Sequence, residues 1–118
     1  MNIDILVGLR LESCRLSRGS YSFELDGQKD GRYYNFSIET SYYLSFSEKK
    51  KDVCENYSKY MWSLFEMKLI EVTLDEEKGH VIFKFKNDKK IIIWGDNPLI
   101  DNLLMVRNIK SGEWFMVG

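Results

Sequence analysis

The sequence predicts an α+β fold that is mostly antiparallel β, with two three-stranded meander units joined by one helix and followed by a C-terminal hairpin. Three observations predict it: short runs in which apolar and polar residues alternate, turn residues between those runs, and one segment with apolar residues at helical spacing. The chain is also rich in aromatic residues, with 7 Phe, 7 Tyr and 3 Trp against a single proline. Large flat side chains pack well on a pleated surface, so this composition suits sheets.

The clearer meander unit lies at about 64–96. Its middle run, "HVIFKFK", alternates so that one face is strongly apolar and the other mostly polar. Asn87 and Asp88 follow it, and both residue types tolerate the left-handed backbone of tight turns. The next run, "IIIW", is apolar on both faces, as expected of a central strand. With the preceding run "MKLIEVTLD", these segments predict three consecutive antiparallel strands.

A weaker copy of this pattern occurs at about 5–46, in "LRLESCRLS", "GSYSFELDG" and "YNFSIET". Gly19 corresponds to Gly79, and Asp26-Gly27 corresponds to the turn at Asn87-Asp88. A longer loop is then expected before the third strand. The copies share strand order and turn positions but not surface residues. Two unrelated meanders that happen to look alike are the alternative to a true repeat.

The segment between the units predicts one helix at about 50–65. Its apolar residues recur at helical spacing, at Val53, Tyr57, Tyr60, Met61 and Leu64. The end of the chain, "LLMVRNIKSGEWFMVG", predicts a hairpin at about 102–117. No linker or low-complexity tract interrupts the pattern, so residues 1–118 are expected to form a single domain.

The charges nearly balance, since 17 Lys and Arg face 18 Asp and Glu for a net charge of −1. Such a balance gives no overall attraction to nucleic acid or to an anionic membrane. The first residues lack the basic and apolar regions of a signal peptide, and no run approaches the roughly 18 apolar residues of a membrane span. We therefore expect a cytoplasmic protein without membrane contact. Cys14 and Cys54 are then expected to be reduced thiols.

No residue pattern predicts catalysis. His80 is the only histidine; it begins a strand, where we expect it to face solvent, and no serine nucleophile motif lies near it. No CxxC or HxxH spacing is present, so neither a metal site nor a cofactor is predicted. Paired carboxylates stay open as an alternative because 18 acids are available. The prediction is a protein that is not an enzyme.

Lysines raise an alternative function, a small oligonucleotide-binding domain. Lys84, Lys86, Lys89 and Lys90 line the hairpin of the second unit. If Tyr33, Tyr34 and Trp94 lay near them, bases could stack on the rings while the lysines met the phosphates. Lysine on an exposed strand also serves to discourage edge-to-edge aggregation, which is the simpler interpretation.

Two pairs of adjacent tyrosines, Tyr33-Tyr34 and Tyr42-Tyr43, indicate a protein-binding surface. Adjacent strand residues point to opposite faces, so one tyrosine of each pair is expected to face solvent. Exposed tyrosine beside mixed charge is a composition favoured in protein interfaces.

The second half of the chain resembles a known family. The run "LIEVTLDEEKGHVIFKFKNDKKIIIWGD", followed by "SGEW", is similar to small immunity-like domains in which an acidic turn ends in Gly and a Glu-Trp pair comes near the end. The chain thus resembles the immunity proteins of bacterial polymorphic toxin systems, including those of contact-dependent growth inhibition. The resemblance implies a binding protein whose partner is a cognate toxin C-terminal domain, in many cases a nuclease with a basic groove. It implies no catalysis.

Acidic and aromatic residues are the candidate contacts for such a toxin. The acids are Asp75, Glu76 and Glu77 in one turn, with Glu39 and Asp96 at the ends of the paired third strands; the aromatic anchors are Tyr42, Tyr43 and Trp94. We expect these recognisable groups at the surface, where an acidic patch would imitate the phosphate backbone that a nuclease binds.

Overall fold

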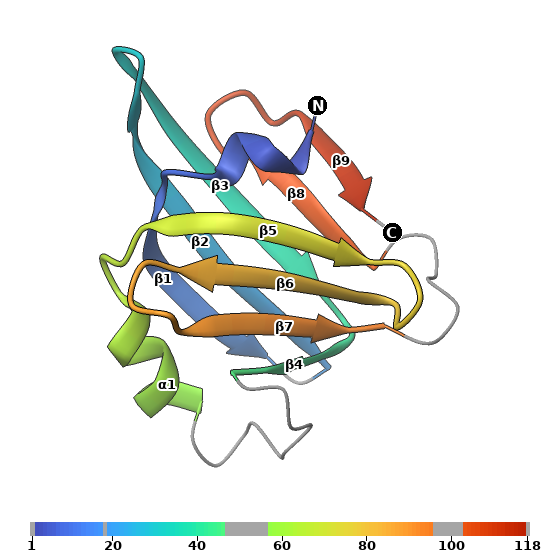
Figure 1. Ribbon diagram of the computed structural model, residues 1–118. Helices are drawn as coiled ribbons and strands as arrows, with labels where there is room; N and C mark the ends of the chain where they lie inside the picture. The colour runs from blue at the N-terminus through green and yellow to red at the C-terminus, as the bar shows by residue number, and fades with distance from the viewer. Residues whose placement is uncertain (1, 18, 47–56, 96–102, 118) are drawn as a thin grey trace.

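The computed structural model describes residues 2–17, 19–46, 57–95 and 103–117, which form two antiparallel sheets (Figure 1). Sheet A has the strand order β1-β2-β3-β8-β9, and sheet B has the order β4-β7-β6-β5. The strands are β1 (Arg10–Ser17), β2 (Ser20–Lys29), β3 (Arg32–Thr40), β4 (Tyr43–Ser45), β5 (Leu69–Asp75), β6 (His80–Phe85), β7 (Lys90–Trp94), β8 (Leu104–Asn108) and β9 (Trp114–Val117), with a 3-10 helix η1 (Ile3–Leu6) and one α-helix α1 (Tyr57–Leu64). The predicted class, mostly antiparallel β with one helix, is confirmed.

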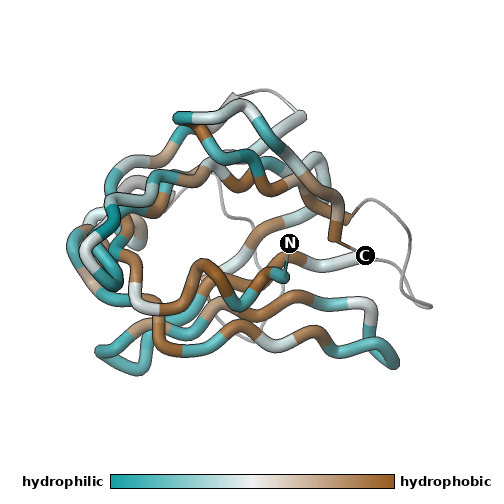
Figure 2. The backbone as a smooth tube through the Cα atoms, turned by 90° about the horizontal axis from the view of Figure 1, so that it is seen from above, coloured by the Kyte–Doolittle hydropathy of each residue, from teal (hydrophilic) through white to brown (hydrophobic). Residues whose placement is uncertain are grey.

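The two sheets lie face to face as layers, and their strands run across one another (Figures 1 and 2). Along most strands hydrophobic positions alternate with polar ones, whereas β7 carries three consecutive buried isoleucines, and each sheet turns one apolar face to the other. Phe23 of β2 and Phe83 of β6 meet edge to face, with ring centroids 5.3 Å apart. The core therefore depends on both meander units at once.

The two predicted meanders are present: β1-β2-β3 within sheet A and β5-β6-β7 within sheet B. Gly19 and Gly79, which precede the second strand of each unit, both have left-handed backbone, at φ +81° and +72°. The turn at Asn87-Asp88 is also where it was predicted, with Asp88 at φ +65°.

The predicted turn at Asp26-Gly27 is wrong. Strand β2 continues through these residues, and Asp26 pairs with Asn35 of β3. The turn falls on the next Asp-Gly, where Asp30 and Gly31 have φ +52° and +77°, as a two-residue hairpin requires. Only this turn pairs Leu25 with Phe36 and so aligns the buried residues of both strands.

The chain passes between the sheets where β3 ends. Ser41 and Tyr42 make a bend at which the chain leaves sheet A. The next strand, β4, pairs with β7 of sheet B. A second connection lies at the starts of β1 and β5, where the Gly8 amide donates to the Leu69 carbonyl at 2.7 Å and the Leu69 amide donates to the Leu9 carbonyl at 2.8 Å. The sheets are thus joined both through the chain and through hydrogen bonds.

Helix α1 is shorter in the described residues than the predicted 50–65, since it covers Tyr57–Leu64. The part of the prediction before residue 57 lies outside the described residues. Met61 and Leu64 are buried against the core, whereas Trp62 is 76% exposed. The predicted C-terminal hairpin is confirmed by the pairing of β8 with β9. No helix among the described residues is long and apolar enough to cross a membrane.

Candidate functional site

One end of the sandwich gathers most of the predicted site residues, and we call it the crossover end. It comprises the bend Glu39–Tyr43, the turn Asp75–Gly79 and Trp94 at the end of β7. Asp75, His80, Trp94 and Tyr43 form one register row across β5, β6, β7 and β4. Paired residues share a face, and this row alternates with the core row of Val81, Ile93 and Leu44, so it belongs to the outer face of sheet B.

The aromatic members of this row are held in place. The Trp94 indole Nε1 donates a hydrogen bond to Ser45 Oγ at 2.6 Å, and the His80 ring lies against the Trp94 ring with centroids 4.1 Å apart. Both side chains are half-buried. His80 therefore lies on the outer face of sheet B, where the large neighbouring indole covers part of its ring.

In the acidic turn Asp75–Gly79, the Asp75 carboxylate forms a hydrogen bond within the turn, whereas Glu76 and Glu77 extend into solvent. Asp75 Oδ1 accepts from the Lys78 amide at 3.1 Å, and the Asp75 carbonyl accepts from the Gly79 amide at 2.8 Å. Glu76 and Glu77 are exposed. The Gly95 amide donates to the Gly79 carbonyl at 2.8 Å, which ties this turn to the end of β7 beside Trp94. The two glutamates are therefore presented on a defined support.

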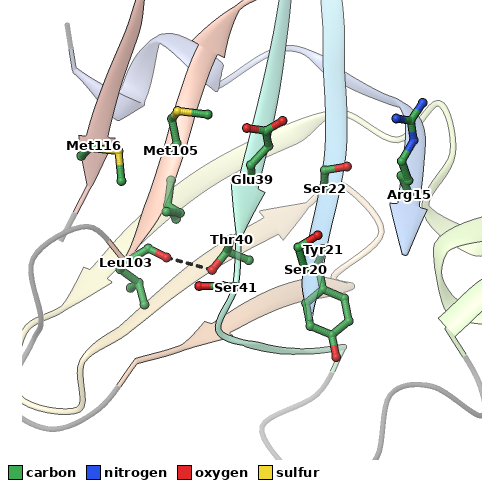
Figure 3. A pocket seen from close by; sticks show the side chains of 11 residues that line it. Arg15, Ser20, Tyr21, Ser22, Glu39, Thr40, Ser41, Leu103, Met105 and Met116 are labelled. Atoms are coloured by element: carbon green, nitrogen blue, oxygen red, sulfur yellow. Dashed lines mark hydrogen bonds between the residues drawn. The ribbon is translucent and has the colours of Figure 1, made fainter. Parts of the chain in front are cut away.

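Glu39 lies around the corner, on the outer face of sheet A. It belongs to a row that crosses all five strands, made of Arg15, Ser22, Glu39, Met105 and Met116. These side chains lie side by side in Figure 3. Arg107 Nη2 approaches Glu39 Oε2 only to 4.0 Å, and both side chains are more than 40% exposed, so the carboxylate stays accessible.

A cavity of about 480 Å³ opens at this corner (Figure 3). Its walls combine polar residues with apolar ones, namely Arg15, Ser20, Tyr21, Ser22, Glu39, Thr40, Ser41, Leu103, Leu104, Met105 and Met116. Thr40 is buried, and its hydroxyl donates to the Leu103 carbonyl at 2.8 Å while accepting from the Tyr42 amide at 3.0 Å. One threonine therefore fixes both the bend and the start of the segment that leads into β8.

The tyrosine pairs behave differently from each other. Tyr33 is 51% exposed and Tyr34 is half-buried, as predicted. Tyr42 lies in the bend, and Tyr43 lies in the outer-face row of sheet B. Both side chains are half-buried, so neither is as exposed as Tyr33.

The structure thus brings seven predicted residues to one end of the molecule, in the bend, in the acidic turn and on the adjoining outer faces of the two sheets; Asp96 lies outside the described residues. Sequence reasoning missed Tyr21, Met105 and Met116, which line the cavity beside Glu39. The alternation in "EWFMV" could have indicated this role for Met116. It places this large apolar residue on the face of an edge strand that points away from the core, where a binding surface can use it.

The lysine hairpin does not form the expected stacking platform. Lys84 and Lys90 face each other across β6 and β7, and Lys84 Nζ lies 3.7 Å from Asp88. Trp94 stands at the far end of β7 from Lys90, roughly 13 Å away at the usual rise of a strand. Tyr33 and Tyr34 belong to the other sheet. The lysines of this hairpin and the Trp94 ring are therefore separated along the strand.

Cys14 is a free, half-buried thiol on β1, and Cys54 lies outside the described residues. Burial raises the pKa of the Cys14 thiol, which keeps it protonated and weakly nucleophilic at neutral pH. Among the residues that the structure describes, no three His, Cys, Asp or Glu side chains are grouped so as to hold a metal ion.

No family model, curated protein or solved structure matches this chain.

Proposed function

We propose that this chain is an immunity-type protein that binds a bacterial toxin domain through the crossover end and blocks it without catalysis, in the cytoplasm. The observation that carries the proposal is that this end combines exposed carboxylates with a hollow of mixed polar and apolar lining. Glu76 and Glu77 stand in solvent on a fixed turn, and Met105 and Met116 line the cavity beside Glu39. Buried apolar anchors surrounded by charge are the usual anatomy of a protein interface.

The hollow would take the anchor residue of the partner. Methionine side chains adapt to irregular partners because they are unbranched and polarisable, and Met116 is 39% exposed. An immunity protein needs nanomolar affinity, about −12 kcal/mol, from an interface of roughly 800 Å² on each partner. One cavity is too small for that area, so the acidic turn and the outer row of sheet A are included in the proposed contact.

The exposed carboxylates indicate that the partner surface is basic. A nuclease domain has a basic groove for its substrate, and Glu39, Glu76 and Glu77 would meet that groove in place of phosphates. Complementary charge speeds association and disfavours wrong partners. The net charge of −1 does not produce this effect by itself, so the local arrangement must do so.

A growth assay tests the proposal. The chain is co-expressed with the C-terminal domain encoded immediately upstream in its native locus, and survivors are counted against that domain alone and against the domain with an unrelated β-protein. We expect rescue by this chain only. An upstream product that is harmless, or that kills regardless, would contradict the proposal. Salt-dependent retention of the chain on single-stranded DNA or RNA would then favour the oligonucleotide-binding alternative.

A further inference from the structure

A second cavity lies away from the crossover end, where the end of α1 meets the start of β1. Its volume is about 810 Å³, and it is lined by Arg10, Leu11, Glu12, Asp26, Trp62, Phe65 and Glu66. The two segments are joined by backbone hydrogen bonds, since the Glu66 amide donates to the Leu11 carbonyl at 2.9 Å and the Leu11 amide donates to the Met67 carbonyl at 3.3 Å. The cavity walls are therefore part of the folded framework.

Aromatic rings form one wall of this cavity. Trp62 is 76% exposed, the largest exposed fraction among the large hydrophobic residues that the structure describes as exposed. Its ring is held edge to face against Phe65, with centroids 5.5 Å apart and planes at 85°. Phe65 itself packs against the core. The part of this indole that is open to solvent can take a flat ligand group.

Carboxylates also line this cavity. Glu12, Asp26 and Glu66 line the cavity with Arg10 as the only cation among the lining residues, and Arg10 is paired in register with Asp26. The pKa of Tyr33 reflects the negative charge around Asp26. Its pKa is raised, first by the hydrogen bond that its hydroxyl donates to Asp26 at 2.8 Å, then by desolvation and by the charges of Asp26, Glu12 and Glu24.

Glu66 holds its place at a conformational cost. It follows α1 with a left-handed backbone at φ +67°, a conformation that glycine or asparagine adopts far more easily at the end of a helix. The glutamate side chain is exposed, and its carboxylate makes no hydrogen bond or ion pair with the residues that the structure describes. A side chain that disfavours its own backbone conformation is consistent with a use for the carboxylate in binding.

We infer that this cavity binds an arginine side chain presented by a protein partner, with the guanidinium plane on the Trp62 indole and its N–H groups donating to Glu66 and Glu12. Arginine fits because its planar cation both stacks on aromatic faces and forms forked hydrogen bonds to carboxylates. The inference does not depend on the proposed toxin or on the crossover end, and it can be tested without a toxin.

The test uses N-acetyl-arginine methylamide as the probe and the citrulline analogue as its uncharged match in shape. Each is titrated into the millimolar range against the labelled full chain while the indole N–H signals are followed by NMR. We expect the arginine probe to shift the Trp62 signal in a saturable way and the citrulline probe to leave it in place. Equal shifts with both probes, or no shift with arginine, would overturn the inference.

Two variants separate the contributions of the ring and the charge. Trp62→Ala, observed through the Tyr33 and Glu66 amide signals, is expected to weaken the arginine probe about threefold or more, whereas Trp114→Ala, which removes another exposed indole, is expected to have no effect. Glu66→Gln is expected to weaken binding without changing the melting temperature. Glu66→Gly is expected to weaken binding and to raise the melting temperature, because it relieves the backbone. Unchanged affinity in both Trp62→Ala and Glu66→Gln would overturn the inference.

Discussion

At the scale of single residues, Thr40 is the clearest test of how the crossover end is built. Its hydroxyl donates to the Leu103 carbonyl and accepts from the Tyr42 amide, and the residue is only 6% exposed. Thr40→Val keeps the shape but leaves both backbone groups without that partner. We expect a loss of about 1–3 kcal/mol in the free energy of unfolding, measured by urea denaturation.

The matched control for this change is Thr73→Val on β5. Thr73 is exposed, and its hydroxyl has only a long contact of 3.4 Å to Glu71. Its replacement should change stability by less than about 0.5 kcal/mol. Equal losses at Thr40 and Thr73 would show that the hydroxyl of Thr40 does not fix the bend.

At the scale of elements, the contact between the end of β7 and the acidic turn depends on the absence of a side chain at Gly95. A Cβ there would come within 2.4 Å of the Gly79 carbonyl oxygen and 2.9 Å of Leu103 Cδ1. Gly95→Ala must therefore move backbone apart, and we expect a loss of about 2 kcal/mol or more in the free energy of unfolding, measured by thermal and urea denaturation.

Gly112→Ala is the comparison for this prediction. Gly112 has φ +79° but open space around its Cα. An alanine there should lower the free energy of unfolding only by the cost of its left-handed backbone, about 1 kcal/mol. A smaller loss at Gly95 than at Gly112 would contradict the close contact between β7 and the turn.

The elements themselves could be predicted from sequence wherever the side-chain period was clear. Strands β6 and β7, the turn between them and the terminal hairpin all lie where the alternation places them. The first hairpin was mispredicted because the chain offers two Asp-Gly signals four residues apart. Local turn chemistry does not distinguish them, whereas the pairing of Leu25 with Phe36 does. That pairing is a property of two strands together, which no single run reveals.

At the scale of the whole molecule, surface patterns were harder to predict than the core. Trp94 and Tyr43 are candidate anchors by their residue type, and both are half-buried in a row that spans four strands of sheet B. The cavities depend on which strands become neighbours: Met105 and Glu39 meet only because β8 joins β3. Such long-range pairing is fixed by the packing of two sheets and leaves no local trace in the sequence.

The central claim is that the crossover end binds a toxin domain, and titration calorimetry with an inactivated form of that domain tests it most directly. The variants are Glu76→Lys combined with Glu77→Lys at the crossover end, and Glu113→Lys, an exposed acid beyond the far end of β8, as the control. The account predicts at least about a tenfold loss of affinity, or 1.4 kcal/mol, for the double variant and wild-type affinity for the control, with unchanged melting temperatures. Wild-type affinity in the double variant would contradict it and remove the acidic turn from the interface.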